Sequence, residues 1–360
     1  MQSVYIHIPF CKKICSYCDF PKMIYDNEMA DDYLEALANE ISNIYDGTEI
    51  STIYIGGGTP SCLTHDQLLK LFEIANIFNK NKLLEFTIEA NLEDITSDFL
   101  EIIKTNGVTR LSIGIQTFNS NFLELINRNA DFNDAKEKIM LVKSYGIHNI
   151  NLDLMYAFPN QKLGDLKKDL KMFLKLEPTH ISTYSLILEE NTKLYIEKYE
   201  NISDELDSEM YDYICKKLAK NGFNHYEVSN FALPKYESIH NTNYWLNNEY
   251  YGFGLGAHGF IQGFRYENTH SLNEYINGVY RLRDYLVSYQ EMMENELMLG
   301  FRLLKGINIK RFYERYHENI QDVFPIKPLL KSGELMYKGD YIFINPSKIY
   351  VMDSILLKLV

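Results

Sequence analysis

Three cysteines near the start of the chain, Cys11, Cys15 and Cys18, stand close enough together to bind one metal centre. They follow an apolar, β-branched run at residues 4–8 that ends at Pro9, so one short loop carries all three thiols. Soft sulfur ligands select iron–sulfur clusters or zinc. A cubane iron–sulfur cluster normally takes four cysteines. Three would leave one iron open to another molecule, and an open metal position serves chemistry rather than structure.

Two other interpretations of this loop are buried thiols and structural zinc. Lys12, Lys13, Ser16 and Asp19 lie among the cysteines, which makes the loop a poor core segment. A structural zinc site needs a fourth ligand, and no nearby cysteine supplies one. His7 could be that fourth ligand only if the strand that carries it reversed its direction. A zinc-stabilised binding protein remains an alternative hypothesis.

Further candidate residues lie where other apolar runs end. Gly56, Gly57 and Gly58 directly follow the second run, and glycines let the backbone approach a ligand closely. Glu89 ends the third run. Asp153 lies within the fifth, where an acid is costly unless it is paired or liganded. A tight turn would equally explain the glycines, and a surface position would explain Glu89.

Short apolar runs alternate with amphipathic segments through about residue 190, and this alternation predicts the elements that position these residues. Such a βα alternation with apolar strands predicts an α/β fold, with a parallel sheet covered by helices. In such sheets the active site lies at the carboxyl ends of the strands. The expected strands are residues 4–8, 52–55, 84–89, 110–115, 149–155 and 180–188, and the expected helices are residues 31–45, 64–78, 96–106, 133–145 and 163–176.

After about residue 195 the pattern changes. A long helical stretch at residues 203–221 precedes an aromatic and glycine-rich segment at residues 226–264. Two short strands are expected at residues 335–338 and 341–344, joined by Gly339 and Asp340. We therefore predict two domains, residues 1–225 and residues 226–360, of which the second is a smaller α+β, winged-helix-like lid.

Composition limits the partners of the chain. With 36 basic and 49 acidic residues the net charge is −13, which argues against nucleic-acid binding. No apolar stretch approaches the roughly 18–20 residues of a membrane span, so only peripheral membrane association is expected. Five cysteines without a secretory signal indicate a reducing, cytoplasmic location.

The spacing C-x3-C-x2-C resembles the signature of the radical S-adenosylmethionine (SAM) superfamily. The longer string YIHIPFCxxxCxYCDF resembles one branch of it, which comprises the oxygen-independent coproporphyrinogen III dehydrogenases (HemN) and the HemW-type heme chaperones. The similarity continues through nearly the whole chain. It implies a partial (β/α)6 TIM-like barrel followed by a HemN-type C-terminal domain. It also implies a [4Fe–4S] cluster held by Cys11, Cys15 and Cys18, whose open iron binds the amino and carboxylate groups of SAM.

The resemblance also implies residues that hold SAM. The GGGTP element would hold the methionyl amino group, and Gln116 and Asp153 would contact the ribose. Arg128 would pair with the methionyl carboxylate, which suits its planar fork. The family usually has glycine and leucine where this chain has Ala157 and Phe158. The full implied set for SAM is Tyr5, Tyr17, Gly57, Gly58, Thr59, Glu89, Gln116, Arg128, Asp153 and Ile187.

The second half carries His240-Asn-Thr-Asn-Tyr244-Trp245, which resembles the HNxxYW heme-binding motif of HemW-type proteins. It implies His240 as the axial ligand, because histidine is a common heme ligand and aromatic walls suit a flat macrocycle. His258 lies nearby as another possible ligand. A plain alternative is an aromatic core patch.

Two departures indicate the HemW-type branch. Phe20 stands where the dehydrogenases have a fourth cysteine, and the segment before the cluster loop is short. The implied function is a heme chaperone that binds heme and inserts it into acceptor apo-proteins. The alternative is an enzyme that receives electrons from a donor protein and converts coproporphyrinogen III to protoporphyrinogen IX by oxidative decarboxylation. Whether the chain is an enzyme stays open at this point.

Overall fold

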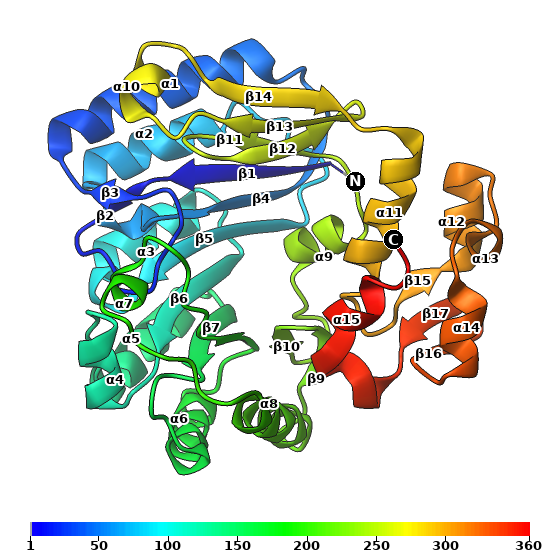
Figure 1. The fold of residues 1–360 in the computed structure, drawn as a ribbon. Coiled ribbons are helices and arrows are strands. Elements are labelled where there is room, and N and C mark those ends of the chain that lie inside the picture. Colours follow the sequence, from blue (N-terminus) through cyan, green and yellow to red (C-terminus); the bar gives the residue numbers. More distant parts are fainter. Residues whose placement is uncertain (1) are drawn as a thin grey trace.

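The computed structural model describes residues 2–360 and is built around one twelve-stranded sheet (Figure 1). Six parallel strands form its centre, in the order β1-β4-β5-β6-β7-β8. All six predicted strands are confirmed, within a few residues at each end. Their bounds are β1 (Gln2–Ile8), β4 (Ile50–Gly57), β5 (Glu85–Asn91), β6 (Arg110–Gln116), β7 (Asn149–Tyr156) and β8 (His180–Ser185).

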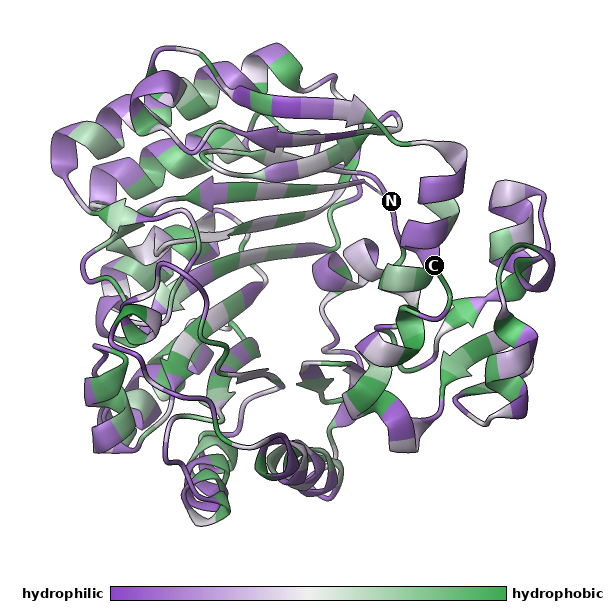
Figure 2. Cartoon of the chain, viewed as in Figure 1, coloured by the Kyte–Doolittle hydropathy of each residue, from purple (hydrophilic) through white to green (hydrophobic). Residues whose placement is uncertain are grey.

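Helices follow the central strands, as predicted. Capping residues set their starts: the Thr64 side chain accepts a hydrogen bond from the Gln67 amide, and the Gln67 side chain accepts one from the Thr64 amide. In Figure 2 the helices over the sheet carry both hydrophobic and hydrophilic residues, as expected for one buried and one solvated face. The helices are α1 (Asn27–Ile44), α2 (His65–Ala75), α3 (Ser97–Thr105), α4 (Ser120–Leu125), α5 (Phe132–Ser144) and α6 (Leu163–Lys175), of which α4 is not predicted by the sequence pattern.

The sheet extends well beyond the predicted strands. On the β1 side, β11 pairs with β1 in parallel, and β12, β13 and β14 continue antiparallel. On the β8 side, β10 and β9 add antiparallel strands. The bounds are β9 (Asn224–Glu227), β10 (Asn230–Ala232), β11 (Tyr250–Phe253), β12 (His258–Ile261), β13 (Phe264–Asn268) and β14 (Arg281–Leu286).

Much of the aromatic and glycine-rich segment, predicted as part of a lid, is therefore sheet. Close packing explains the glycines there: a Cβ at Gly259 would lie 2.0 Å from the Tyr266 ring. The Tyr266 hydroxyl accepts a hydrogen bond from the Gly252 amide at 2.9 Å. The sheet thus crosses the predicted division at residues 225/226, and the division itself stays a prediction.

The C-terminal part is a small α+β unit, as predicted (orange to red in Figure 1). Its three-stranded sheet has the order β15-β17-β16, and the two expected strands have the predicted bounds. These strands are β15 (Ile307–Asn308), β16 (Leu335–Lys338) and β17 (Tyr341–Ile344). The other strands and α-helices are β2 (Phe10–Cys11), β3 (Met23–Ile24), α7 (Lys193–Ile196), α8 (Asp204–Ala219), α9 (Ile239–Trp245), α10 (Leu272–Ile276), α11 (Tyr289–Gly300), α12 (Ile309–Tyr316), α13 (Ile320–Val323), α14 (Ile326–Lys331) and α15 (Met352–Leu356).

Among residues 2–360, no helix combines the length and the apolar character needed to cross a membrane.

Candidate functional site

Two cavities lie side by side in the sheet region and share Phe20 in their walls. The first, of about 400 Å³, is called the cysteine cavity because it is lined by Cys11, Cys15 and Cys18. The second, of about 430 Å³, is called the aromatic cavity because Tyr5, Tyr54, Tyr244 and Tyr250 line it. Both have the size of small-molecule binding sites.

The cysteine cavity lies at the carboxyl ends of the central strands, as predicted for a parallel sheet. It brings together most of the residues that the sequence suggested for SAM. Tyr5 is the exception: its hydroxyl donates a hydrogen bond to His7 Nδ1 at 2.9 Å, in the wall of the aromatic cavity. The suggested residues that line the cysteine cavity are Tyr17, Gly57, Gly58, Thr59, Glu89, Gln116, Arg128, Asp153 and Ile187.

The cysteine loop is held in place by backbone hydrogen bonds at both ends and in its middle. Short strands β2 and β3 pair in parallel, and the Met23 amide donates to the Pro9 carbonyl at 2.8 Å. In the middle, the Ser16 amide donates to the Ile126 carbonyl at 3.1 Å. Burial raises the pKa of the Cys11 and Cys18 thiols above the ordinary cysteine value. Metal binding at these thiols would therefore release protons.

The surroundings of the thiols fit an iron–sulfur cluster with an open iron. A Cβ at Gly58 would lie 2.8 Å from the Phe10 carbonyl oxygen and 3.0 Å from Cys11 Sγ, so only glycine leaves this space free. Arg128 Nε donates a hydrogen bond to Cys15 Sγ at 3.2 Å, so a cationic side chain lies against the cysteine loop. Within residues 2–360, no three His, Cys, Asp or Glu side chains are placed to hold a single metal ion.

Arg128 is fixed in the cavity wall by neutral partners. Its Nη1 donates to Asn91 Oδ1 at 2.8 Å and to the Gly114 carbonyl oxygen at 3.0 Å. A Cβ at Gly114 would lie 3.3 Å from the same nitrogen, which explains the small residue there. No carboxylate of the described chain neutralises Arg128 within salt-bridge distance. The guanidinium is thus available to an anionic group of a ligand.

Two acids face the same cavity. Glu89 accepts hydrogen bonds from the Tyr54 hydroxyl at 2.6 Å and from the Gly57 amide at 3.2 Å. Burial raises the pKa of Glu89 to about 7 and that of Asp153 to about 6. Carboxyl groups that lack a cationic partner in this way are ready to receive a positive group of a ligand.

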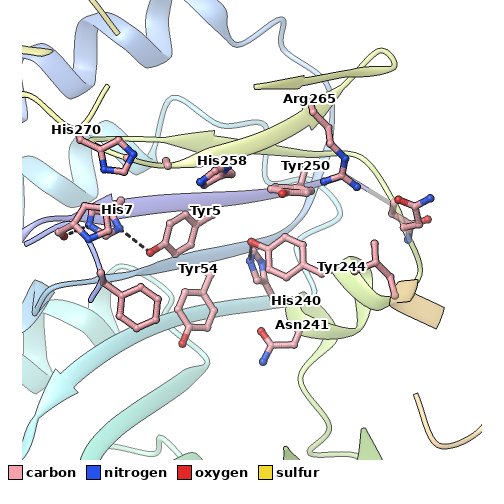
Figure 3. Close-up of a pocket in the computed structure, with 17 residues that line it drawn as sticks. Tyr5, His7, Tyr54, His240, Asn241, Tyr244, Tyr250, His258, Arg265 and His270 are labelled. Atoms are coloured by element: carbon pink, nitrogen blue, oxygen red, sulfur yellow. Dashed lines mark hydrogen bonds between the residues drawn. The ribbon is translucent and has the colours of Figure 1, made fainter. Parts of the chain in front are cut away.

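The aromatic cavity contains His240, the suggested heme ligand, at the start of α9 (Figure 3). Its Nδ1 lies 2.8 Å from Thr52 Oγ1 and its Nε2 lies 2.8 Å from the Tyr244 hydroxyl. The side chain is 1% exposed, and burial lowers its pKa to about 3, so the imidazole is neutral. Trp245, the last residue of the suggested motif, does not line this cavity; the Arg302 guanidinium lies 5.8 Å from its ring centre.

The sequence patterns missed two residues of the aromatic cavity, Arg265 and His270, and named His258 only as another possible ligand near His240. They come from β12, β13 and the segment after β13, strands that the pattern did not reveal. In the local sequence only a charged or imidazole side chain marks each of them, and such residues are common on surfaces. Their common place emerges from the pairing of β12 with β13.

Comparison with known proteins identifies the family. Residues 5–173 match the radical SAM superfamily model, and residues 287–347 match the HemN C-terminal domain model. A heme chaperone HemW of Bacillus subtilis is 40% identical over 92% of this chain and 92% of its own length. The HemW of Lactococcus lactis is 38% identical over 90% of this chain and 87% of its own length.

The chain belongs to the HemW family of radical SAM proteins.

The predicted resemblance and fold class are thereby confirmed for this HemW-family protein. The structure of the coproporphyrinogen III oxidase HemN from Escherichia coli shares the fold, with a TM-score of 0.88 at 22% identity over 99% of this chain and 89% of that one. One departure from the family pattern, Ala157, has an unfavourable backbone conformation. Ala157 adopts φ 62°, a left-handed conformation that favours glycine. Phe158 next to it is fully buried and stacks on Phe122, with ring centres 4.8 Å apart.

Proposed function

We propose that this protein binds heme in the aromatic cavity and delivers it to acceptor apo-proteins, as a heme chaperone with a [4Fe–4S] cluster and SAM in the cysteine cavity. The observation that carries the proposal is the aromatic cavity itself, which places His240 and an aromatic wall directly beside the cysteine cavity. The HemW name of relatives that match over most of their length supports it. We place this delivery in the reducing cytoplasm, where the thiols stay available.

The residues of the cysteine cavity suit SAM in separate ways. The three thiols would hold the cluster, which supplies an open iron and an electron when it is bound and reduced. Arg128 would pair with the methionyl carboxylate, and the backbone at Gly57 and Gly58 would admit the methionyl group closely. Glu89 would face the positive part of the ligand.

The raised pKa of Glu89 makes SAM binding depend on pH. Since this pKa lies at about 7, the carboxyl is ionised above pH 7 and protonated below it. A cationic ligand binds the ionised form, so we expect the affinity for SAM to fall about tenfold between pH 8 and pH 6. Anaerobic isothermal titration of the cluster-loaded protein measures this.

Glu89→Gln should bind SAM more weakly at pH 8 and lose most of the pH dependence. Glu101→Gln, at an exposed position on α3, is the matched control and should keep the wild-type profile. A wild-type affinity that is unchanged between pH 8 and pH 6 would contradict the role given to Glu89.

The chaperone proposal is separated from the dehydrogenase alternative by one anaerobic assay. Cluster-reconstituted protein is mixed with SAM, a low-potential reductant and coproporphyrinogen III, and the oxidised porphyrins are analysed. We expect no protoporphyrin from a preparation with a full cluster. The appearance of protoporphyrin would establish the dehydrogenase and overturn the proposal.

A further inference from the structure

We propose that heme in the aromatic cavity is ligated by His258 rather than by His240, and that Arg265 pairs with a carboxylate of the porphyrin. The inference rests on the proposed function, since it names the contacts of the heme that the cavity would receive. It follows from comparing the four histidines that line the cavity and from locating its charged groups.

An axial ligand needs an imidazole nitrogen with a free lone pair that can reach the iron. His7 has neither nitrogen free, because Nε2 donates to the Pro21 carbonyl at 2.8 Å and Nδ1 accepts from the Tyr5 hydroxyl. His240 is in the same state, with both nitrogens at hydrogen-bond distance from Thr52 and Tyr244 and almost no exposed surface. Ligation by either ring would first break a buried hydrogen bond, which is costly.

The other two histidines are on the open side of the cavity. His270 Nε2 is 2.8 Å from Glu267 Oε1 and forms a hydrogen bond with it. The His258 side chain is 60% exposed, and its Nε2 lies 3.8 Å from the same carboxylate oxygen, beyond hydrogen-bond distance. His258 is therefore the least committed imidazole of the four. The Glu267 carboxylate is instead bound by His270 at one oxygen and by Arg283 at the other.

Arg265 is the only Lys, Arg, Asp or Glu side chain among the residues that line the aromatic cavity. Within the described chain it has no carboxylate partner at salt-bridge distance, and its guanidinium lies 5.1 Å from the Phe260 ring centre. An arginine fork that lacks a carboxylate partner and is half-buried beside an apolar cavity suits a flat ligand with a carboxylate at its rim. Heme is such a ligand.

The strand register places the two proposed contacts on the same face of the sheet. Phe260 of β12 lies opposite Arg265 of β13, and His258 lies opposite Glu267. Because side chains two residues apart on a strand share a face, His258, Arg265 and Glu267 all project to one side. Figure 3 shows His258 and Arg265 on these neighbouring strands, above the Tyr54 and Tyr244 rings. His240 instead forms hydrogen bonds with Thr52 and Tyr244, and so acts as a positioning residue in the wall of the aromatic cavity.

The test is a hemin titration of cluster-loaded variants, followed by their visible spectra. His258→Ala should lower hemin affinity about tenfold or more and lose the spectrum of imidazole-ligated heme, and added imidazole should restore that spectrum. His270→Ala, at the neighbouring ring, should keep the wild-type spectrum. His240→Ala should weaken binding, but the heme that it binds should keep the wild-type spectrum. Because His258 is exposed and Arg265 is half-buried, both variants should fold, as judged by cluster absorbance.

The carboxylate contact is tested with hemin and its dimethyl ester. Arg265→Gln should weaken hemin binding about tenfold but bind the dimethyl ester as the wild type does, because the ester has no carboxylate to pair. An equal loss for both ligands would overturn the role of Arg265. The role of His258 would be overturned if His258→Ala kept the wild-type spectrum, while His240→Ala lost the spectrum of imidazole-ligated heme and regained it when imidazole was added. If the wild type itself does not bind hemin saturably, the proposed function fails instead.

Discussion

Alanine in place of Cys11, Cys15 or Cys18 is expected to remove nearly all iron and acid-labile sulfide from the reconstituted protein. A cluster with one open iron already lacks a fourth protein thiolate, so the loss of one more leaves only two ligands. The three side chains line one cavity, and the loop that carries them is tied down by β2 and β3. The measurement is iron and sulfide content after anaerobic reconstitution, with the visible absorbance of the cluster.

Cys62→Ala and Cys215→Ala are the matched controls. Cys62 is buried beneath the loop, where its thiol lies 3.4 Å from the Phe10 carbonyl oxygen, and Cys215 lies on α8. Both variants should keep their full iron content. A Cys15→Ala protein with wild-type iron would contradict the cluster assignment. A colourless wild-type protein that contains zinc would support the zinc-stabilised alternative instead.

Glu85→Ala is expected to be the most destabilising single substitution near the cavities. The carboxylate is 2% exposed and accepts hydrogen bonds from Arg110 Nε at 3.1 Å and from the His240 amide at 3.0 Å. It also accepts from Ser238 Oγ and the Ile239 amide, each at 3.2 Å, and so fixes the start of α9 to β5. Removing it leaves the buried Arg110 charge unpaired, which costs about 3–5 kcal/mol of unfolding free energy.

Urea unfolding of cluster-free protein measures this loss, because a bound cluster would violate two-state behaviour. Glu49→Ala is the control, since the Glu49–Lys82 ion pair is exposed and contributes about 0–1 kcal/mol. Hemin binding by Glu85→Ala should also weaken, because α9 carries His240. Equal urea midpoints for Glu85→Ala and Glu49→Ala would show that the buried pair does not anchor α9.

The sequence predicted what depends on local pattern and failed where distant segments meet. The six central strands and the cysteine loop follow from apolar runs and residue spacing, and both are in place. Strand β11 was missed because a short, glycine-containing run acquires its strand character only by pairing with β1, at the other end of the chain. Tyr5 illustrates the same limit for the site: its motif position suggested SAM, whereas its hydrogen bond to His7 places it in the aromatic cavity.

The proposed heme contacts show why the remainder of the site was not predicted in full. His240 has a recognisable motif, but only the structure shows that Thr52 and Tyr244 occupy both of its nitrogens. His258 was only a second possible ligand in the sequence and Arg265 was not singled out, and the β12–β13 register alone brings the two to one face.

A hemin titration of the cluster-loaded wild-type protein is the most direct measurement of whether this chain is a heme carrier. We expect saturable binding of a single heme per chain, with the spectrum of histidine-ligated iron, at concentrations where the Glu85→Ala variant binds weakly. Absorbance that rises linearly without saturation, with the spectrum of free hemin, would contradict the presence of a heme site in the aromatic cavity.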